Sequence, residues 1–191
     1  MKIQQAIQSS IQVKQDILSD PSFLENIQNV ADVMFTALSQ GHKVLFCGNG
    51  GSAADAQHLA AELSGRFYFD RDPLPAEALH CNTSFMTAVA NDYGYDEVYA
   101  RMIKGTGVAG DVLVGLSTSG NSKNIIRAFE MAKSKQIVTV ALTGVSGGSM
   151  KNVVDFLINV PSIDTPRIQE SHIMIGHILC ELVEERLFGK Q

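Results

Sequence analysis

The chain has few cysteines, no excess of positive charge and no long apolar run, and each absence excludes a class of protein. Its three cysteines, Cys47, Cys81 and Cys180, are far apart and form no paired motif, which is typical of free thiols in a reducing compartment. The formal net charge is -5 at pH 7 and no basic stripe is present, so we expect no nucleic acid as a direct partner. Residues 1–20 lack an apolar signal-like block, and no apolar run is long enough to span a bilayer. We therefore expect a cytoplasmic protein that makes no contact with a membrane.

The composition is that of ordinary soluble proteins and predicts a single domain, residues 1–191. Of the 191 residues, 45% are hydrophobic and 18% are charged, which is enough for a full hydrophobic core. Apolar residues recur at helical spacing on both sides of Asp20-Pro21, which predicts two N-terminal helices. We expect this helical extension to cover residues 1–41 and an α/β core to cover 42–191. The helical pair packs either against another subunit or on the sheet of its own chain.

From Lys43 onward, short apolar strands alternate with helical stretches. The predicted strands are 43–47, 76–80, 111–116, 137–142 and 155–160. The predicted helical stretches are 51–64, 83–90, 95–105, 122–135, 147–152 and 165–187. The strands show little polar alternation, as is typical of strands that helices cover on both faces. This order predicts a doubly wound α/β fold, in which a five-stranded parallel sheet follows a helical hairpin and a long helix ends the chain.

The most informative segment is a glycine-rich turn that joins a strand to a helix. The apolar run 44–46 leads into Gly-Asn-Gly-Gly-Ser at 48–52, and an alanine-rich helical pattern follows. Such a helix start offers unpaired backbone N–H groups and a partial positive charge, which suit a phosphate. His58 and Glu62 come next, four residues apart and so on one helix face. One element thus supplies an anion cradle together with an acid/base or metal-ligand pair.

A second polar turn follows another apolar strand, and it carries four hydroxyl groups within six residues. These belong to Ser117, Thr118, Ser119 and Ser122. A helix cap needs only one hydroxyl, so four favour an anion site. Neither turn fits a nucleotide motif, because the first lacks the third glycine of a dinucleotide fingerprint and the second lacks Gly-Lys-[Ser/Thr]. Two such turns at the carboxyl ends of parallel strands indicate a ligand site.

The last helical stretch carries a polar stripe on an otherwise apolar helix. Gln169, His172 and His177 fall within about 140° of the helix circumference. We interpret His172 as a core or interface histidine, whereas spacing leaves the role of His177 open. Together with His58 and Glu62, Gln169 and His177 can hold a divalent metal, for which zinc is favoured. The same groups can instead serve as general base and acid without a metal, and the residues alone leave both interpretations open.

Two further features have less specific interpretations. Asn91-Asp92-Tyr93-Gly94 is either a plain C-cap with a turn or a site at which Asn91 and Asp92 bind sugar hydroxyls. Arg66 is either a surface arginine, which we favour, or a group that reaches a phosphate across a subunit boundary.

Taken together, these motifs resemble the sugar isomerase (SIS) domain family, whose fold is flavodoxin-like. The resemblance covers nearly the whole chain and rests on Cys-Gly-Asn-Gly-Gly-Ser-Ala-Ala-Asp-Ala-Gln-His, Ala-Ala-Glu-Leu-Ser-Gly-Arg, Ala-Asn-Asp-Tyr-Gly, Ser-Thr-Ser-Gly-Asn-Ser and Arg-Ile-Gln-Glu…His. More narrowly, the chain resembles the members that convert D-sedoheptulose 7-phosphate to D-glycero-D-manno-heptose 7-phosphate for the core of lipopolysaccharide. The resemblance implies a homotetramer with active sites between subunits and a phosphorylated seven-carbon sugar as substrate.

The resemblance also implies roles for individual residues. Glu62 and His177 match the family's proposed catalytic base and acid. The positions of one zinc ion per subunit match His58, Glu62, Gln169 and His177. The phosphate and neighbouring oxygens would contact Ser52, Ser117, Thr118, Ser119 and Ser122. The remaining substrate-binding positions match Asn49, Gly50, Gly51, Glu62, Asn91, Asp92 and Gln169.

The chain departs from the family at Pro166, where several members carry an aspartate, and Asp164 lies two residues earlier. No catalytic role is therefore transferred to that position. The alternative function is a non-catalytic phosphosugar-binding scaffold, as in an SIS regulator that binds the bacterial replication initiator. Residues 96–100 are reminiscent of that regulator, which lacks counterparts of Glu62 and His177. A helix-turn-helix regulator is a third option, and no DNA-binding module supports it.

Overall fold

Two helices begin the chain, as the apolar spacing predicts. In this computed structural model, which describes residues 1–189, they are α1 (Lys2–Leu18) and α2 (Pro21–Ser39). The Asp20 side chain accepts hydrogen bonds from the backbone N–H groups of Ser22, at 3.0 Å, and Phe23, at 3.2 Å. This cap, together with Pro21 at the first helical position, fixes where α2 begins.

Five parallel strands form one sheet in the order β2-β1-β3-β4-β5. They are β1 (Val44–Gly48), β2 (Ala76–Ala78), β3 (Val112–Leu116), β4 (Val138–Gly144) and β5 (Phe156–Val160). The order is that of flavodoxin-like sheets and confirms the predicted doubly wound fold. Strand β2 is shorter than predicted, because the chain turns at Leu79 and His80, where the Cys81 N–H group donates to the Ala78 carbonyl at 3.2 Å.

The helices after β1 are α3 (Gly51–Ser64), α4 (Thr83–Tyr93), α5 (Val98–Thr106), α6 (Lys123–Ser134) and α7 (Thr165–Phe188). The predicted stretch 95–105 is divided into a 3₁₀ helix, η1 (Tyr95–Glu97), and α5. A second 3₁₀ helix, η2 (Met150–Asn152), lies within the predicted short turn. The long final helix is confirmed.

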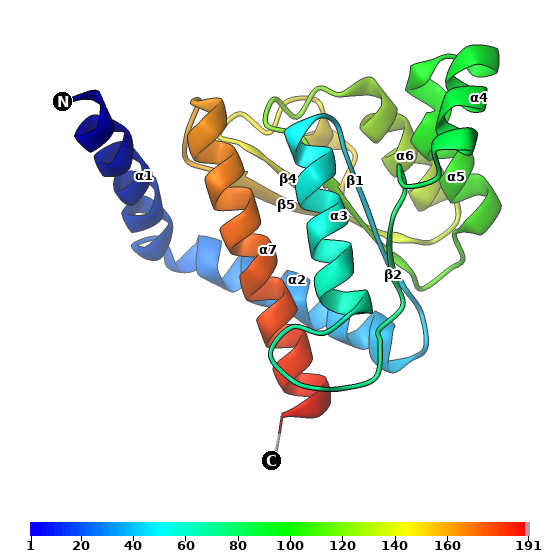
Figure 1. The fold of residues 1–191 in the computed structure, drawn as a ribbon, viewed down its shortest axis with the longest axis horizontal. Coiled ribbons are helices and arrows are strands. Elements are labelled where there is room, and N and C mark those ends of the chain that lie inside the picture. The colour runs from blue at the N-terminus through cyan, green and yellow to red at the C-terminus, as the bar shows by residue number, and fades with distance from the viewer. Residues whose placement is uncertain (190–191) are drawn as a thin grey trace.

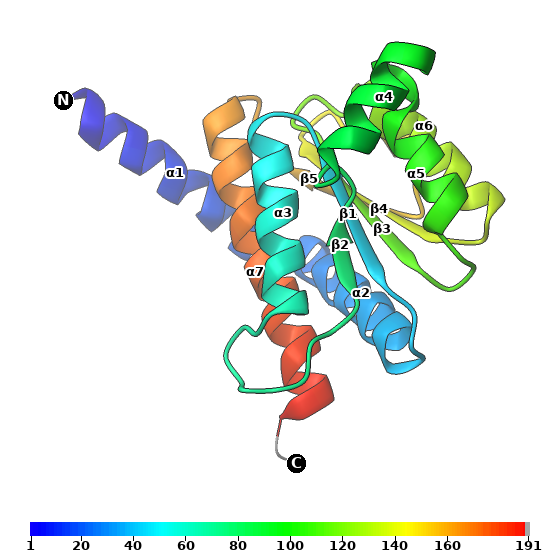
Figure 2. The same ribbon diagram turned by 45° about the vertical axis from the view of Figure 1, so that its right-hand side comes forward.

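The sheet separates two hydrophobic clusters, and adjacent residues of β1 face opposite ones. Val44 and Phe46 pack with α2, α3 and α7 on one face, whereas Leu45 and Cys47 pack with α4, α5 and α6 on the other. Figures 1 and 2 show these two helical layers. Because both faces are covered, the strands carry the near-continuous apolar runs seen in the sequence.

The two N-terminal helices behave differently, so neither predicted packing of the hairpin applies to both. Helix α2 packs on the chain's own sheet, where Val30 and Met34 are fully buried. Helix α1 projects from the body (Figure 1) and buries only Val13 and Ile17. Ile3 and Ile7, on its exposed side, are 73% and 55% exposed. Helix α1 therefore keeps an uncovered apolar face in the single chain.

The cysteines and the long helices agree with the composition of the chain. All three cysteines are free, with Cys47 and Cys180 buried and Cys81 exposed. Among residues 1–189, no helix has the combination of length and apolar character that crossing a membrane requires.

Candidate active site

The turn between β1 and α3 has the geometry that its glycines predict. Gly48 allows a close approach, because a Cβ there would lie 2.3 Å from the Ser52 carbonyl oxygen. Gly50 has a φ of 57° and forms the N-cap of α3, so no side chain caps this helix. Ser52, the second residue of α3, is buried. The turn therefore presents an uncapped helix N-terminus, which suits an anion.

The hydroxyl groups of the second turn lie together rather than serving as caps. Ser117 Oγ is 3.0 Å from Ser122 Oγ and 3.5 Å from Ser119 Oγ. Ser122 is the N-cap residue of α6, yet its side chain makes no capping hydrogen bond. The structure thus brings three of the four predicted hydroxyls into one cluster at the start of a helix.

Thr118 contributes differently, through a cavity beside this cluster. The cavity has a volume of about 320 Å³ and lies between the carboxyl ends of the strands and the start of α7. Its hydroxyl-bearing lining residues are Thr118, Ser119, Ser146, Ser162 and Thr165. Neutral donors of this kind suit a small polar ligand.

The two turns are joined by a pair of asparagines. Asn49 Nδ2 donates to Asn124 Oδ1 at 3.0 Å, and Asn124 Nδ2 donates to Asn49 Oδ1 at 2.9 Å. The Tyr95 hydroxyl also donates to Asn49 Oδ1 at 3.0 Å. Asn49 therefore fixes the turn and keeps one N–H free for a ligand. The sequence analysis missed Asn124, although a polar residue at a buried position of α6 was a usable signal.

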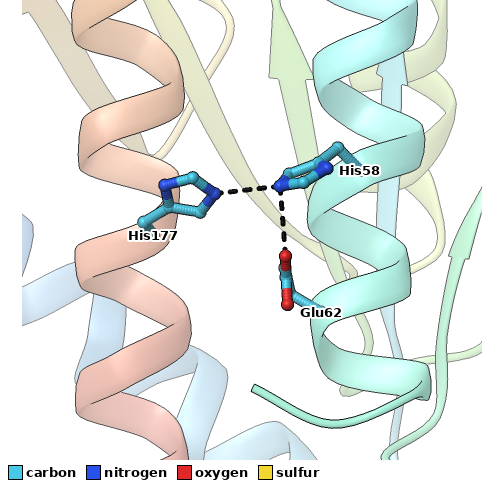
Figure 3. Close-up of side chains that lie close together, drawn as sticks. All are labelled: His58, Glu62 and His177. Atoms are coloured by element: carbon cyan, nitrogen blue, oxygen red, sulfur yellow. Dashed lines mark hydrogen bonds and ion pairs between the residues drawn. The ribbon is translucent and has the colours of Figure 1, made fainter. Parts of the chain in front are cut away.

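His58, Glu62 and His177 meet between α3 and α7. His58 Nε2 lies 3.0 Å from His177 Nε2 and 3.1 Å from Glu62 Oε1, and Figure 3 shows the three side chains pointing toward one another. One ligand atom from each residue lies within 4.8 Å of the other two. A single hydrogen on His58 Nε2 serves two acceptors poorly, whereas a cation satisfies all three lone pairs. The two imidazoles and one carboxylate therefore fit a zinc-type metal ion.

The close approach of the two helices has a simple cause. Gly176 precedes His177, and a Cβ there would lie 2.5 Å from the methyl groups of Leu59, the residue after His58. A larger residue would separate the backbones, so the glycine lets the two imidazoles meet.

Neighbouring groups complete the surroundings of these three residues. The Phe67 ring packs against the His177 ring with 5.9 Å between centroids. Burial raises the pKa of Asp55 on α3, while the nearby His58 and His177 oppose that rise. This part of the site is therefore partly shielded from water, and it contains the carboxyl group of Asp55 in addition to that of Glu62.

Gln169 lies elsewhere on α7. Its Nε2 atom would be 2.7 Å from a Cβ on Gly51, so the amide lies against the start of α3. It is eight residues before His177, which corresponds to about 12 Å along the helix axis. Within one chain, the four predicted ligands are thus arranged as three together and one at the phosphate-type turn, and the ligand role of Gln169 stays a prediction.

The other residues singled out in the sequence lie outside the His58, Glu62 and His177 cluster. His172 is fully buried, and its Nε2 lies 3.1 Å from the Thr143 carbonyl, in agreement with a core histidine. Asn91 and Asp92 are exposed, and Asn91 Nδ2 donates to Asp92 Oδ1 at 2.8 Å. Gly94, with a φ of 89°, is the C-cap of α4, in agreement with the interpretation of this segment as a C-cap with a turn. Arg66 is exposed, in agreement with a surface residue.

Comparisons with known proteins point to one family. The model of the SIS domain matches residues 12–144. The phosphoheptose isomerase of Aneurinibacillus thermoaerophilus is 54% identical over 186 residues, which cover 97% of this chain and 94% of that protein. The phosphoheptose isomerase structures from Neisseria gonorrhoeae and Francisella tularensis have TM-scores of 0.90 and 0.92 at 42% and 38% identity, with 96% of this chain and 97% of each of those chains covered. The chain therefore belongs to the SIS domain family and, within it, to the phosphoheptose isomerases.

Proposed function

We propose that the protein isomerises D-sedoheptulose 7-phosphate to D-glycero-D-manno-heptose 7-phosphate. The single observation that carries the proposal is the meeting of Glu62 and His177 with His58, in a chain similar to phosphoheptose isomerases over nearly its whole length. A carboxylate and an imidazole are the groups that proton transfer between two adjacent carbons and their oxygens requires.

The phosphate would bind at the two turns. Ser52, the hydroxyl groups of Ser117, Thr118, Ser119 and Ser122, and the backbone at Asn49, Gly50 and Gly51 would hold it, with Asn91, Asp92 and Gln169 along the sugar chain. The uncapped start of α3 and the clustered hydroxyls support this assignment. Neutral donors and helix N-termini bind a phosphate monoester without a lysine.

In the reaction, Glu62 would take a proton from C1 of the ketose, which leaves a cis-enediol. The proton is returned at C2, and His177 would move protons between the two oxygens. No other reactant is consumed, so the reaction balances as an isomerisation. Two different side chains are needed because the proton on carbon and the protons on oxygen are transferred at different places.

We propose one zinc ion per subunit, held by His58, Glu62 and His177, with Gln169 as a fourth ligand. When bound, zinc would polarise the two substrate oxygens. The convergence of three lone-pair donors supports this choice.

We also propose a cytoplasmic homotetramer that supplies heptose for lipopolysaccharide. The uncovered apolar face of α1 supports self-association.

Activity assays of two variants test the proposal. Glu62→Gln keeps the shape of the side chain and removes its basicity, and His177→Ala removes the imidazole. Each should lower kcat by about 10²- to 10⁴-fold, the usual contribution of a general acid or base. Glu181→Gln, an exposed change on α7, should match wild type.

The alternative, a non-catalytic phosphosugar-binding scaffold, uses the two turns but has no need of Glu62 or His177. An inactive wild-type protein that still binds the sugar phosphate, or variants that match wild type, would favour it over the isomerase.

A further inference from the structure

A buried ion pair holds the loop that follows α3. Arg71, in the loop between α3 and β2, and Glu184, on α7, have side chains only 2% and 1% exposed. Arg71 Nε donates to Glu184 Oε1 at 2.7 Å. In Figures 1 and 2 this loop passes across the lower half of α7. The pair therefore joins the two helices that carry His58, Glu62 and His177.

Glu184 binds the backbone of the loop as well as Arg71. Its carboxylate accepts hydrogen bonds from the N–H groups of Phe67 at 3.0 Å, Tyr68 at 2.6 Å and Phe69 at 3.1 Å. Burial alone would raise the pKa of Glu184, but these donors and Arg71 hold it below the ordinary glutamate value. The carboxylate is therefore charged and fully hydrogen-bonded near neutral pH.

Arg71 binds the end of α3 through carbonyl oxygens. Its guanidinium donates to the carbonyls of Glu62 at 3.0 Å and Leu63 at 2.9 Å, and also to those of Gly65 and Asp72. Carbonyls in the last turn of a helix have no partner within that helix, so the arginine satisfies them. One of them belongs to Glu62, the proposed base.

The network also reaches His177. Glu184 is seven residues after His177, which places both on the same face of α7. Phe67, whose N–H group Glu184 binds, packs its ring against the His177 ring. The Arg71 guanidinium thus contacts the backbone of Glu62, the proposed base. The Glu184 carboxylate holds Phe67, which packs on His177, the proposed acid.

We propose that Arg71 and Glu184 are positioning residues that hold Glu62 and His177 in register for catalysis. The proposal rests on the proposed function and adds residues outside the proposed sugar and phosphate contacts. A buried ion pair gives no more stability than well-packed apolar residues of similar size. A fully satisfied polar network does, however, fix geometry more tightly than apolar packing.

The test uses Glu184→Gln, which keeps size and removes charge, and Arg71→Lys, which keeps charge and removes the fork of donors. Each should lower kcat about tenfold or more while the KM for sedoheptulose 7-phosphate stays near that of wild type. Zinc affinity, measured by competition with a chromophoric chelator, should fall by about 10- to 100-fold, as for other groups that orient metal ligands. Glu185→Gln, an exposed neighbour on α7, is the matched control and should change neither quantity.

The outcomes separate this proposal from the proposed function. Wild-type kcat and zinc affinity in both variants, with only a lower melting temperature, would overturn the positioning role. An inactive wild type would overturn the isomerase reaction, and the zinc titration would still decide whether the network orients the three ligands. If Glu184→Gln fails to fold, Arg71→Lys and the milder Glu184→Asp decide by the same two measurements.

Discussion

Two histidines of α7 lie five residues apart in opposite surroundings. His177 faces His58 and Glu62 between the helices, whereas His172 is fully buried with its Nε2 3.1 Å from the Thr143 carbonyl. Burial lowers the pKa of His172 to about 4, and the Thr143 carbonyl only partly opposes that effect. A histidine of this kind stays neutral in the folded protein, which suits a core position and not a proton carrier near neutral pH.

The buried His172 predicts a stability loss in mild acid. An unfolded histidine binds a proton below about pH 6.5, whereas folded His172 stays neutral until about pH 4. Between those values the unfolded state binds more protons, so the free energy of unfolding falls as the pH falls. The total loss is on the order of 3 kcal/mol. Urea denaturation near pH 7.5 and near pH 5 should show a smaller loss in His172→Gln than in wild type; equal losses would contradict this account.

At the residue scale, the sequence predicted chemical types better than contacts. Ser117, Ser119 and Ser122 were expected to form an anion site because one cap needs one hydroxyl, and they do lie together. Asn124 was missed because its partner, Asn49, is 75 residues away in the sequence. The same distance problem applies to Arg71 and Glu184, since a lone arginine and a lone glutamate look like surface residues until the fold buries both.

At the scale of elements, the site depends on how closely α3 and α7 pack. Helical spacing predicted that His58 and Glu62 share a face. Their meeting with His177 on α7 was expected from the types of side chain and from the family resemblance, not from spacing. Angular reasoning also grouped Gln169 with His177, because it counts degrees around the helix and ignores the rise along it. The rise places Gln169 beside Gly51 instead.

Gly176→Ala tests this packing. The new methyl group would meet the buried Leu59 side chain at 2.5 Å, so the helices must move apart, at a cost of about 1–3 kcal/mol. Zinc affinity and kcat should fall together, because His58 and His177 would separate. Gly105→Ala is the matched control, since a Cβ there has no neighbour within 4 Å, and it should leave stability and activity unchanged or slightly improved. Wild-type zinc affinity in Gly176→Ala would contradict the packing argument.

At the scale of the whole molecule, the pattern of buried strands and covering helices gave the correct fold. All five strands were placed because each is rich in apolar residues, although β2 carries the exposed Glu77. All are parallel, as expected where helical segments separate successive strands. The packing of the N-terminal hairpin could not be predicted from one chain, because α1 leaves Ile3, Ile7 and Ile11 exposed on one side. An exposed apolar face of this kind supports the proposed self-association.

We expect a tetramer in solution, measured by light scattering. Ile7→Glu places a charge on the exposed face of α1 and should lower the molar mass, whereas Gln8→Glu, on an exposed neighbouring position, should not. A wild-type protein that stays monomeric at high concentration would contradict the expected assembly.

We expect Glu62 and His177, from α3 and α7, to act as one unit on one bound sugar phosphate. A double-mutant cycle of kcat/KM with Glu62→Gln, His177→Ala and the double variant measures this coupling. Residues that act together are non-additive, so the double variant should be about as slow as the slower single variant. Losses that simply multiply would show two independent contributions and would contradict the claim.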